Sequence, residues 1–262
     1  MIVIKYGGHA LPEAGAVDPI LAHIANCHKA GEKLVLVHGG GPQINAELKA
    51  HDIQSEFVGG YRKTTPETFE IVQRVLSGGV LRTLVNQLIG AGVNAIGISA
   101  ADGSTIRATT MKPIVDGVAS DIGMVGQISA VNPVLLNQLL QADYLPVVSP
   151  VACDDFGNGL NLNADLVAGA LGGALTSDQV IFMTDVSGIY RNYPDPASLI
   201  ETISVAELKE LLPTFSEGMI PKVESAISAI EAGANSARII DGRDIKNLVA
   251  ALDSQGGTLV TP

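Results

Sequence analysis

Two short apolar segments that each run into consecutive glycines constrain this chain most. The first reads Ile-Val-Ile-Lys-Tyr-Gly-Gly over residues 2–8, and the second reads Leu-Val-Leu-Val-His-Gly-Gly-Gly-Pro over residues 34–42. Short apolar runs of this kind are typical of strands buried in a parallel sheet. Glycine has no Cβ, so backbone N–H groups in such turns can approach an anion closely. The pattern therefore predicts an α/β fold with two anion-binding turns that follow strands.

Strand and helix signals alternate along the rest of the chain. Helical apolar spacing covers residues 19–29 and follows Pro66 and Pro133, because proline is favoured at the first position of a helix. Further strands are expected over residues 94–98, 145–150, 179–183 and 237–240, and further helices over residues 43–50 and 166–171. Strands separated by helices indicate a mostly parallel sheet covered on both faces. Residues 55–64 and 104–126 are expected to form β-hairpins inserted at one edge.

Composition and charge argue against several classes of partner. The chain of 262 residues is 47% hydrophobic and 16% charged, and its net charge is −11. That charge argues against a nucleic-acid or anionic membrane surface, and no signal peptide or membrane-spanning apolar run occurs. Cys27 and Cys153 have no metal-ligand spacing and are expected to be free, buried thiols. We therefore expect a cytoplasmic protein with no membrane or nucleic-acid partner.

Two lysines are placed to act on an anion. Lys5 follows the first apolar run, and Lys222 lies at the start of an expected helix, where a cation opposes the helix dipole unless an anion binds there. Each lysine also fits a surface role, since a lysine side chain can extend from a strand end into solvent. His38 has no Ser, Cys or metal partner in view and is expected to be structural. Together with the glycine turns, the lysines predict phosphoryl transfer onto a small acid.

Polar residues elsewhere suit either structure or ligand binding. Asp165 follows Asn163 at an expected helix start, so the pair fits helix capping, and Asp165 is also placed to hold the two lysines. Asn161 is a candidate hydrogen-bond partner for a polar substrate. Arg62 lies in a polar, turn-rich segment and fits either an ordinary surface residue or a bidentate clamp on a carboxylate. Residues 184–190 fit a plain β-turn or a loop beside a nucleotide.

Six motifs, taken in order, resemble the amino acid kinase family. They are Ile-Lys-Tyr-Gly-Gly, Val-His-Gly-Gly-Gly-Pro, Gly-Tyr-Arg, Asn-Leu-Asn-Ala-Asp, Thr-Asp-Val-Ser-Gly-Ile and Gly-Met-Ile-Pro-Lys-Val-Glu. The match is collinear over residues 2–258 and is closest to the members that phosphorylate N-acetyl-L-glutamate. The resemblance implies a three-layer αβα sandwich. Residues 1–175 would form the lobe for the acyl amino acid and for dimerisation, and residues 176–262 the lobe for ATP.

The resemblance also implies a reaction and a set of site residues. ATP, with Mg²⁺ on its phosphates and no separate metal site in the protein, would phosphorylate the γ-carboxylate of N-acetyl-L-glutamate for arginine biosynthesis. Catalytic roles carry over to Lys5, Lys222, Asp165, Gly8 and Gly40, and substrate binding to Gly40, Gly41, Arg62 and Asn161. Nucleotide binding carries over to Lys5, Gly7, Gly8, Asp185, Val186, Ser187, Gly188, Ile189, Tyr190, Thr214, Phe215, Ser216 and Lys222. The lysines would stabilise the transferring group, Asp165 would organise them, and glycine N–H groups would bind phosphate oxygens.

Two departures from the family pattern bear on function. Residues 99–103 read Ser-Ala-Ala-Asp-Gly, where many members have a lysine in the third place. Met1 directly precedes the first strand, whereas members inhibited by arginine carry an additional N-terminal helix that interlaces dimers into a hexamer. We therefore expect a homodimer that arginine does not inhibit.

Two other functions fit the same residues. Residues 193–200 resemble relatives that phosphorylate α-aminoadipate or glutamate attached to an acidic carrier protein, although a chain of net charge −11 would need a local basic patch to dock one. A non-catalytic amino-acid sensor on the same fold is the second alternative. Sensing needs no phosphoryl-transfer lysines, so the presence of Lys5 and Lys222 argues against it. ATP turnover distinguishes a kinase from a sensor.

Overall fold

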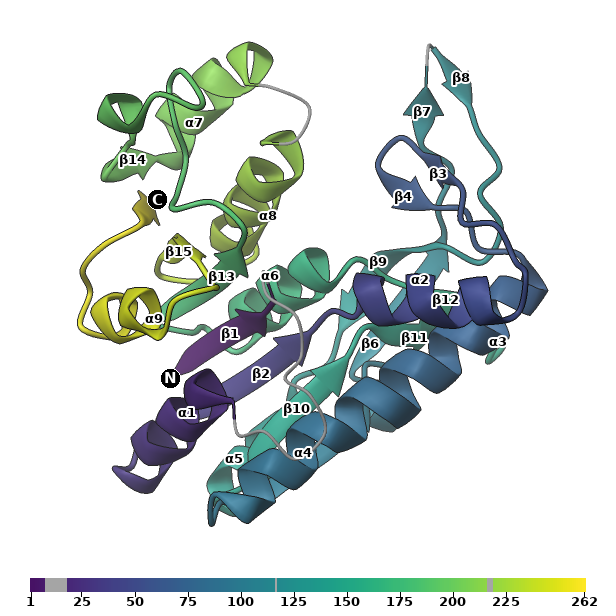
Figure 1. Ribbon diagram of the computed structural model, residues 1–262, viewed down its shortest axis with the longest axis horizontal. Helices are drawn as coiled ribbons and strands as arrows, with labels where there is room; N and C mark the ends of the chain where they lie inside the picture. The colour runs from purple at the N-terminus through teal and green to yellow at the C-terminus, as the bar shows by residue number, and fades with distance from the viewer. Residues whose placement is uncertain (8–17, 116, 216–218) are drawn as a thin grey trace.

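Eight strands in the described part of the chain form one sheet that runs through the molecule (Figure 1). The computed structural model describes residues 1–7, 18–115, 117–215 and 219–262. Across the sheet the order is β14 (Thr202–Ser204), β16 (Thr258–Thr261), β15 (Ala237–Asp241), β13 (Gln179–Thr184), β1 (Ile2–Tyr6), β2 (Leu34–His38), β10 (Leu145–Ser149) and β5 (Ala95–Ser99). Neighbouring strands are parallel except β15 and β16. The expected mostly parallel sheet is confirmed.

Helices cover both faces of this sheet. On one face lie α5 (Val134–Gln141), α6 (Ala164–Ala174) and α8 (Ile220–Glu231), and on the other lie α1 (Pro19–Lys29), α4 (Leu81–Gly90) and α9 (Ile245–Leu252). Successive strand residues point to opposite faces. In β1, Val3 therefore packs on the face covered by α5, α6 and α8, and Ile4 packs on the face covered by α1, α4 and α9. Both side chains are fully buried. The three-layer αβα sandwich is confirmed.

Helix starts follow the capping residues. The Asp18 side chain accepts from the Ile20 N–H at 2.7 Å, Pro19 follows at the first helical position, and α1 has the bounds expected from the sequence. The helix α2 (Gly41–Ala50) begins two residues before the expected start at residue 43, with Pro42 in its first turn. The helix α7 (Val205–Leu211) begins with a reciprocal cap between Ser204 and Glu207.

The helix expected after Pro66 is longer and less regular than its apolar spacing indicates. It comprises α3 (Pro66–Gln73), a π-helical segment (Arg74–Val80) and then α4 without an intervening loop. The Thr65 hydroxyl accepts from the Thr68 N–H at 3.2 Å and caps the start of α3. The continuous helical segment therefore extends from α3, near the hairpins, along the sheet to the end of α4 (Figure 1).

Smaller strands build a second layer at one edge. A four-stranded sheet contains β12 (Gly159–Asn161), β11 (Val151–Cys153), β6 (Ile106–Thr110) and β9 (Gly126–Val131). Two hairpins, β3 (Phe57–Val58) with β4 (Tyr61–Arg62) and β7 (Ile114–Val115) with β8 (Val118–Ala119), rise from it. These elements confirm the hairpins expected over residues 55–64 and 104–126. In Figure 1 they stand opposite α7 and α8.

The prediction for the two cysteines is confirmed in part. Cys27 and Cys153 are free thiols, but both are partly exposed, so the expected burial is wrong. Within the ranges that the structure describes, no helix combines the length and apolar character needed to cross a membrane.

Candidate active site

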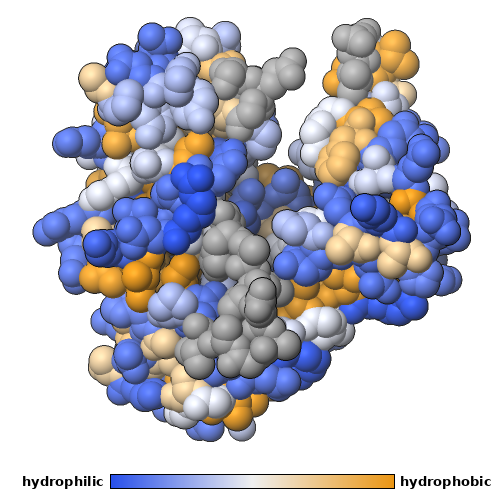
Figure 2. Space-filling view, viewed as in Figure 1, coloured by the Kyte–Doolittle hydropathy of each residue, from blue (hydrophilic) through white to orange (hydrophobic). Residues whose placement is uncertain are grey.

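A cleft of about 690 Å³ opens at the carboxyl ends of β1, β2 and β13. Open α/β sheets bind ligands at this edge. Figure 2 shows the hollow between the C-terminal elements and the hairpins. The sequence-predicted residues that line the cleft are Lys5, Gly7, Gly40, Gly41, Arg62, Asn161, Asp165, Asp185 and Lys222. The fold thus brings together residues from both ends of the sequence.

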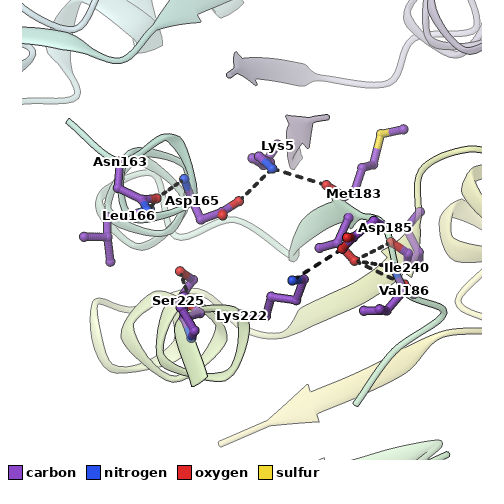
Figure 3. Close-up of polar contacts among 12 residues, drawn as sticks. Lys5, Asn163, Asp165, Leu166, Met183, Asp185, Val186, Lys222, Ser225 and Ile240 are labelled. Carbon is purple, nitrogen blue, oxygen red and sulfur yellow. Dashed lines mark hydrogen bonds and ion pairs between the residues drawn. The ribbon is translucent and has the colours of Figure 1, made fainter. Parts of the chain in front are cut away.

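Lys5 and Asp165 form an ion pair in this cleft (Figure 3). The Lys5 Nζ lies 3.1 Å from Asp165 Oδ1 and donates to the backbone oxygen of Met183 at 3.3 Å. Asn163 caps α6, because its side-chain oxygen accepts from the N–H groups of Asp165 at 2.8 Å and Leu166 at 3.3 Å. Both roles expected for this segment therefore occur together: Asn163 caps the helix, and Asp165 contacts Lys5. The cap fixes the first turn of α6, and that turn carries the carboxylate that holds Lys5.

Gly7 leaves room for the Lys5 ammonium group. A Cβ at Gly7 would lie 2.8 Å from Lys5 Nζ and 3.2 Å from its Cε. The turn after β15 approaches the same backbone, since a Cβ at Gly242 would lie 2.3 Å from the Gly7 carbonyl oxygen. Larger residues at these two positions would displace either the lysine or the glycine turn.

Lys222 reaches the cleft from the first turn of α8. Its Nζ lies 3.4 Å from Oδ1 of Asp185, which immediately follows β13 (Figure 3). The side chains of Lys5 and Lys222 are 14% and 22% exposed, so solvent and salt screen their charges less than those of surface lysines. Each ammonium group has its own carboxylate partner. A contact of Asp165 with Lys222 stays a prediction.

Arg62 lies on β4 and is mostly buried, with 9% of its surface exposed. Its guanidinium donates to Ser55 Oγ and lies 4.7 Å from the centroid of the Phe57 ring. Burial lowers the pKa of Arg62, and an arginine nevertheless stays charged at neutral pH. Among the described residues, no carboxylate forms an ion pair with it. The guanidinium is therefore held in place by neutral groups and is available to an anionic ligand.

Asn161 ends β12 on the same side of the cleft as Arg62. Its Nδ2 donates to the Thr64 hydroxyl at 3.3 Å, and that hydroxyl donates to the backbone oxygen of Arg62 at 2.8 Å. The two residues expected to bind the acid thus share a buried partner.

The second glycine turn joins β2 to α2 above a buried histidine. The His38 Nδ1 donates to the Gly39 carbonyl oxygen at 2.8 Å, and burial lowers the pKa of His38 to about 4. His38 is fully buried and does not line the cleft, in agreement with the expected structural role. A Cβ at Gly40 would lie 2.6 Å from Leu76 Cδ2, so this turn packs closely on the π-helical segment.

Several residues predicted for nucleotide binding do not line the cleft. They are Val186, Ser187, Gly188, Ile189 and Tyr190, in the loop after β13, and Thr214 and Phe215, after α7. The Ile189 side chain is fully buried, and its N–H donates to Thr258 Oγ1 at 2.8 Å. Gly8 and Ser216 lie outside the described residues. The nucleotide contacts of all these residues stay predictions.

Two supporting residues, Thr64 and Phe57, were missed by sequence reasoning. Thr64 binds Asn161, which lies 97 positions away, so no local pattern signals the contact. Thr184 begins the segment expected beside a nucleotide, and it lines the cleft; its hydroxyl donates to the Val186 carbonyl oxygen at 3.1 Å. Phe57 pairs with Arg62 in the hairpin register. That aromatic partner could have been found by aligning the two arms of the expected hairpin.

Comparisons with known proteins agree with this architecture. The model of the amino acid kinase family matches residues 1–241. An acetylglutamate kinase from Mycolicibacterium gilvum is 43% identical over 243 residues, which are 93% of this chain and 84% of the relative. Among solved structures, smu.665 from Streptococcus mutans is 29% identical with a TM-score of 0.79, covering 99% of this chain and 98% of that one. The chain belongs to the amino acid kinase family.

A more distant structure shares the fold. Carbamate kinase from Giardia lamblia bound to AMP-PNP has a TM-score of 0.71 at 21% identity, and the match covers 99% of this chain and 97% of that chain. At this identity the likeness shows the fold alone.

Proposed function

We propose that the chain catalyses ATP-dependent phosphorylation of the γ-carboxylate of N-acetyl-L-glutamate, forming N-acetyl-L-glutamyl 5-phosphate for arginine biosynthesis. The observation that carries the proposal is the convergence of Lys5, Lys222 and Arg62 on one cleft of a chain with net charge −11. The 43% identity to an acetylglutamate kinase over 93% of the chain supports this choice of substrate.

The reaction needs charge neutralisation more than proton transfer. A γ-carboxylate has a pKa near 4.3 and is already ionised at neutral pH, so its attack on phosphorus requires no general base. The barrier comes from bringing this anion against the polyanionic ATP. Lys5 and Lys222 would stabilise the charge on the transferring phosphoryl group, and the N–H groups of the glycine turns would bind its oxygens. The buried, neutral His38 has no part in this step.

The two ends of the cleft suit different substrates. Arg62 and Asn161, on the hairpin and second-sheet side, would bind the α-carboxylate and the acetamido group, with Gly40 and Gly41 beside them. Lys222 and Asp185, on the C-terminal side, would face the nucleotide, together with the predicted loops at residues 186–190 and 214–216. This division corresponds to proposed functional lobes over residues 1–175 and 176–262. Both contribute strands to one sheet, so we propose them as halves of one site.

Mg²⁺ would reach the site on the nucleotide. Among the described residues, no group of three or more His, Cys, Asp or Glu side chains could hold a metal ion. The described acidic residues that line the cleft, Asp165 and Asp185, each hold a lysine. The donor set therefore fits a cation bound mainly by phosphate oxygens.

The primary test is Mg²⁺- and ATP-dependent release of ADP with a panel of acceptors. The panel contains N-acetyl-L-glutamate, L-glutamate, N-acetyl-α-aminoadipate, L-aspartate, carbamate and UMP. We expect selective turnover of N-acetyl-L-glutamate. Turnover of none of these acceptors would contradict the proposal and favour a carrier-linked substrate or a non-catalytic sensor.

Lys222→Ala separates catalysis from general damage to the fold. Loss of a cation aimed at the transferring group is expected to lower kcat by at least about a hundredfold, since such electrostatic contacts contribute a few kcal/mol. Lys209→Ala is the matched control, because Lys209 on α7 pairs with Glu231 at 2.5 Å and is half-exposed away from the cleft. Full activity of Lys222→Ala would show that the assigned mechanism is wrong.

The proposal also includes a cytoplasmic homodimer. Light scattering of the purified chain should give twice the monomer mass. A hexamer, or strong inhibition by arginine, would contradict the expected quaternary state and leave the proposed reaction untouched.

A further inference from the structure

Thr64 is a fully buried threonine between the two residues proposed to bind the acid. It follows β4, which carries Arg62, and faces β12, which ends at Asn161. A buried hydroxyl is costly unless it is hydrogen-bonded, so its partners show what holds it there.

The Thr64 hydroxyl uses its donor and one acceptor position on these two residues. It donates to the Arg62 carbonyl oxygen at 2.8 Å and accepts from Asn161 Nδ2 at 3.3 Å. A hydroxyl has a single proton. Because that proton is given to Arg62, the Asn161 atom that faces Thr64 must be the amide nitrogen. The Asn161 amide is therefore oriented, and its Oδ1 is left as an acceptor for an N–H of a ligand.

Backbone hydrogen bonds fix Thr64 from a second direction. Its N–H donates to the Ile122 oxygen at 2.9 Å, and its oxygen accepts from the Met124 N–H at 2.7 Å. The Met124 oxygen in turn accepts from the Asn161 N–H at 2.9 Å. Gly123 makes this possible, because its φ is +71° and a Cβ there would lie 2.3 Å from the Thr64 oxygen. Hairpin, turn and β12 thus form one hydrogen-bonded unit around Thr64.

We propose that Thr64 is a positioning residue that determines affinity for the acyl amino acid. Its hydroxyl fixes Arg62 and the Asn161 amide relative to one another, so that a carboxylate and a neighbouring N–H of one ligand are bound together. This assignment rests on the proposed function. Thr64 itself does not line the cleft and acts only through its two partners.

The test compares KM values for the two substrates in Thr64→Val, which replaces the hydroxyl with a methyl group of similar size. We expect KM for N-acetyl-L-glutamate to rise about tenfold, the size of effect that loss of one buried hydrogen-bonding group produces. KM for ATP should stay within about twofold, because neither partner faces the proposed nucleotide side. Thr64→Ser keeps the hydroxyl and should restore a KM for the acid close to that of the wild type.

Thr105→Val controls for the loss of a buried hydroxyl as such. Thr105 is also fully buried, donates to the Asp102 oxygen at 2.6 Å and does not line the cleft. We expect this variant to lose stability without a change in either KM. If Thr64→Val behaves like Thr105→Val, or raises both KM values equally, the positioning role is wrong while the proposed function stands. If the wild type turns over no acid of the panel, the proposed function and this assignment both fail.

Discussion

His38 illustrates how a polar residue can support a functional turn while remaining outside the site. Its imidazole is fully buried, one nitrogen donates to Gly39, and Nε2 has no partner among the described atoms. Burial disfavours the charged form, which is why the pKa of His38 falls to about 4. The neutral ring can therefore hold the carbonyl that precedes Gly40 without burying a charge beneath the glycine turn.

This histidine should make folding stability depend on pH. The folded-state pKa, about 4, lies below the ordinary value of 6.5, so the unfolded chain binds the proton first as the pH falls. The free energy of unfolding should decrease by roughly 3 kcal/mol from this group as the pH falls from 6.5 to 4. His38→Asn keeps a donor near Gly39 and should lose that part of the dependence. Urea unfolding at a series of pH values measures it.

An exposed histidine provides the control for this prediction. His51, at the end of α2, is 47% exposed and pairs with Glu47. His51→Asn makes the same substitution at an exposed position and should retain the loss of stability at low pH that is assigned to His38. Equal slopes for the wild type and His38→Asn would show that the buried imidazole does not titrate as its surroundings indicate.

At the scale of helices and strands, the ends of an element were predicted best where a local sequence signal marks them. Asp18 and Pro19 mark the start of α1, and its bounds were predicted correctly. The π-helical segment Arg74–Val80 was missed, because neither its two glycines nor its apolar spacing distinguishes it from an α-helix. The strands β11, β12, β14 and β16 were also missed. They are three or four residues long and are defined by their partners more than by their own composition.

The contacts within the candidate site were likewise predicted only in part. Motif residues such as Lys5 and Asp165 were correctly expected to meet, since the family resemblance places them in one site. The Lys222–Asp185 pair and the Thr64 contacts were not predicted, because they depend on how separate elements pack in three dimensions.

Close packing of α6 against α8 positions two of the charged residues. A Cβ at Gly173 would lie 2.4 Å from Ala232 Cβ and 2.5 Å from its backbone, so α6 cannot accept a larger residue there without moving. Gly173→Ala is therefore expected to lower the free energy of unfolding by about 1–3 kcal/mol, the usual cost of overpacking. Denaturant titration monitored by circular dichroism measures this loss.

Gly90→Ala is the matched substitution for this test. Gly90 ends α4, and a Cβ there would meet nothing within 4 Å. Alanine should be neutral or stabilise the protein by up to about 1 kcal/mol, because it favours the helix over glycine. Equal stabilisation of both variants would show that helix propensity, and not the contact between α6 and α8, decides the outcome.

At the scale of the whole molecule, the two proposed functional lobes share one hydrophobic interior. Strand β1 from the first lobe pairs with β13 from the second, from Ile2 with Gln179 to Lys5 with Phe182. Ile4 of β1 packs in the same buried layer as Ile181, Met183 and Ile240. The site lies where these central strands end, so the fold that stabilises the lobes also positions the cleft.

This shared interior predicts that the first lobe does not fold alone. A fragment of residues 1–175 would expose the β13-facing edge of β1 and the apolar side chains that now pack against β13 and β15, and unfavourable chain entropy would dominate. We expect no cooperative urea transition and little amide protection in the fragment, whereas the full chain should unfold in one transition. A fragment that unfolds cooperatively, with a denaturant slope appropriate to its length, would instead establish residues 1–175 as an independent folding unit.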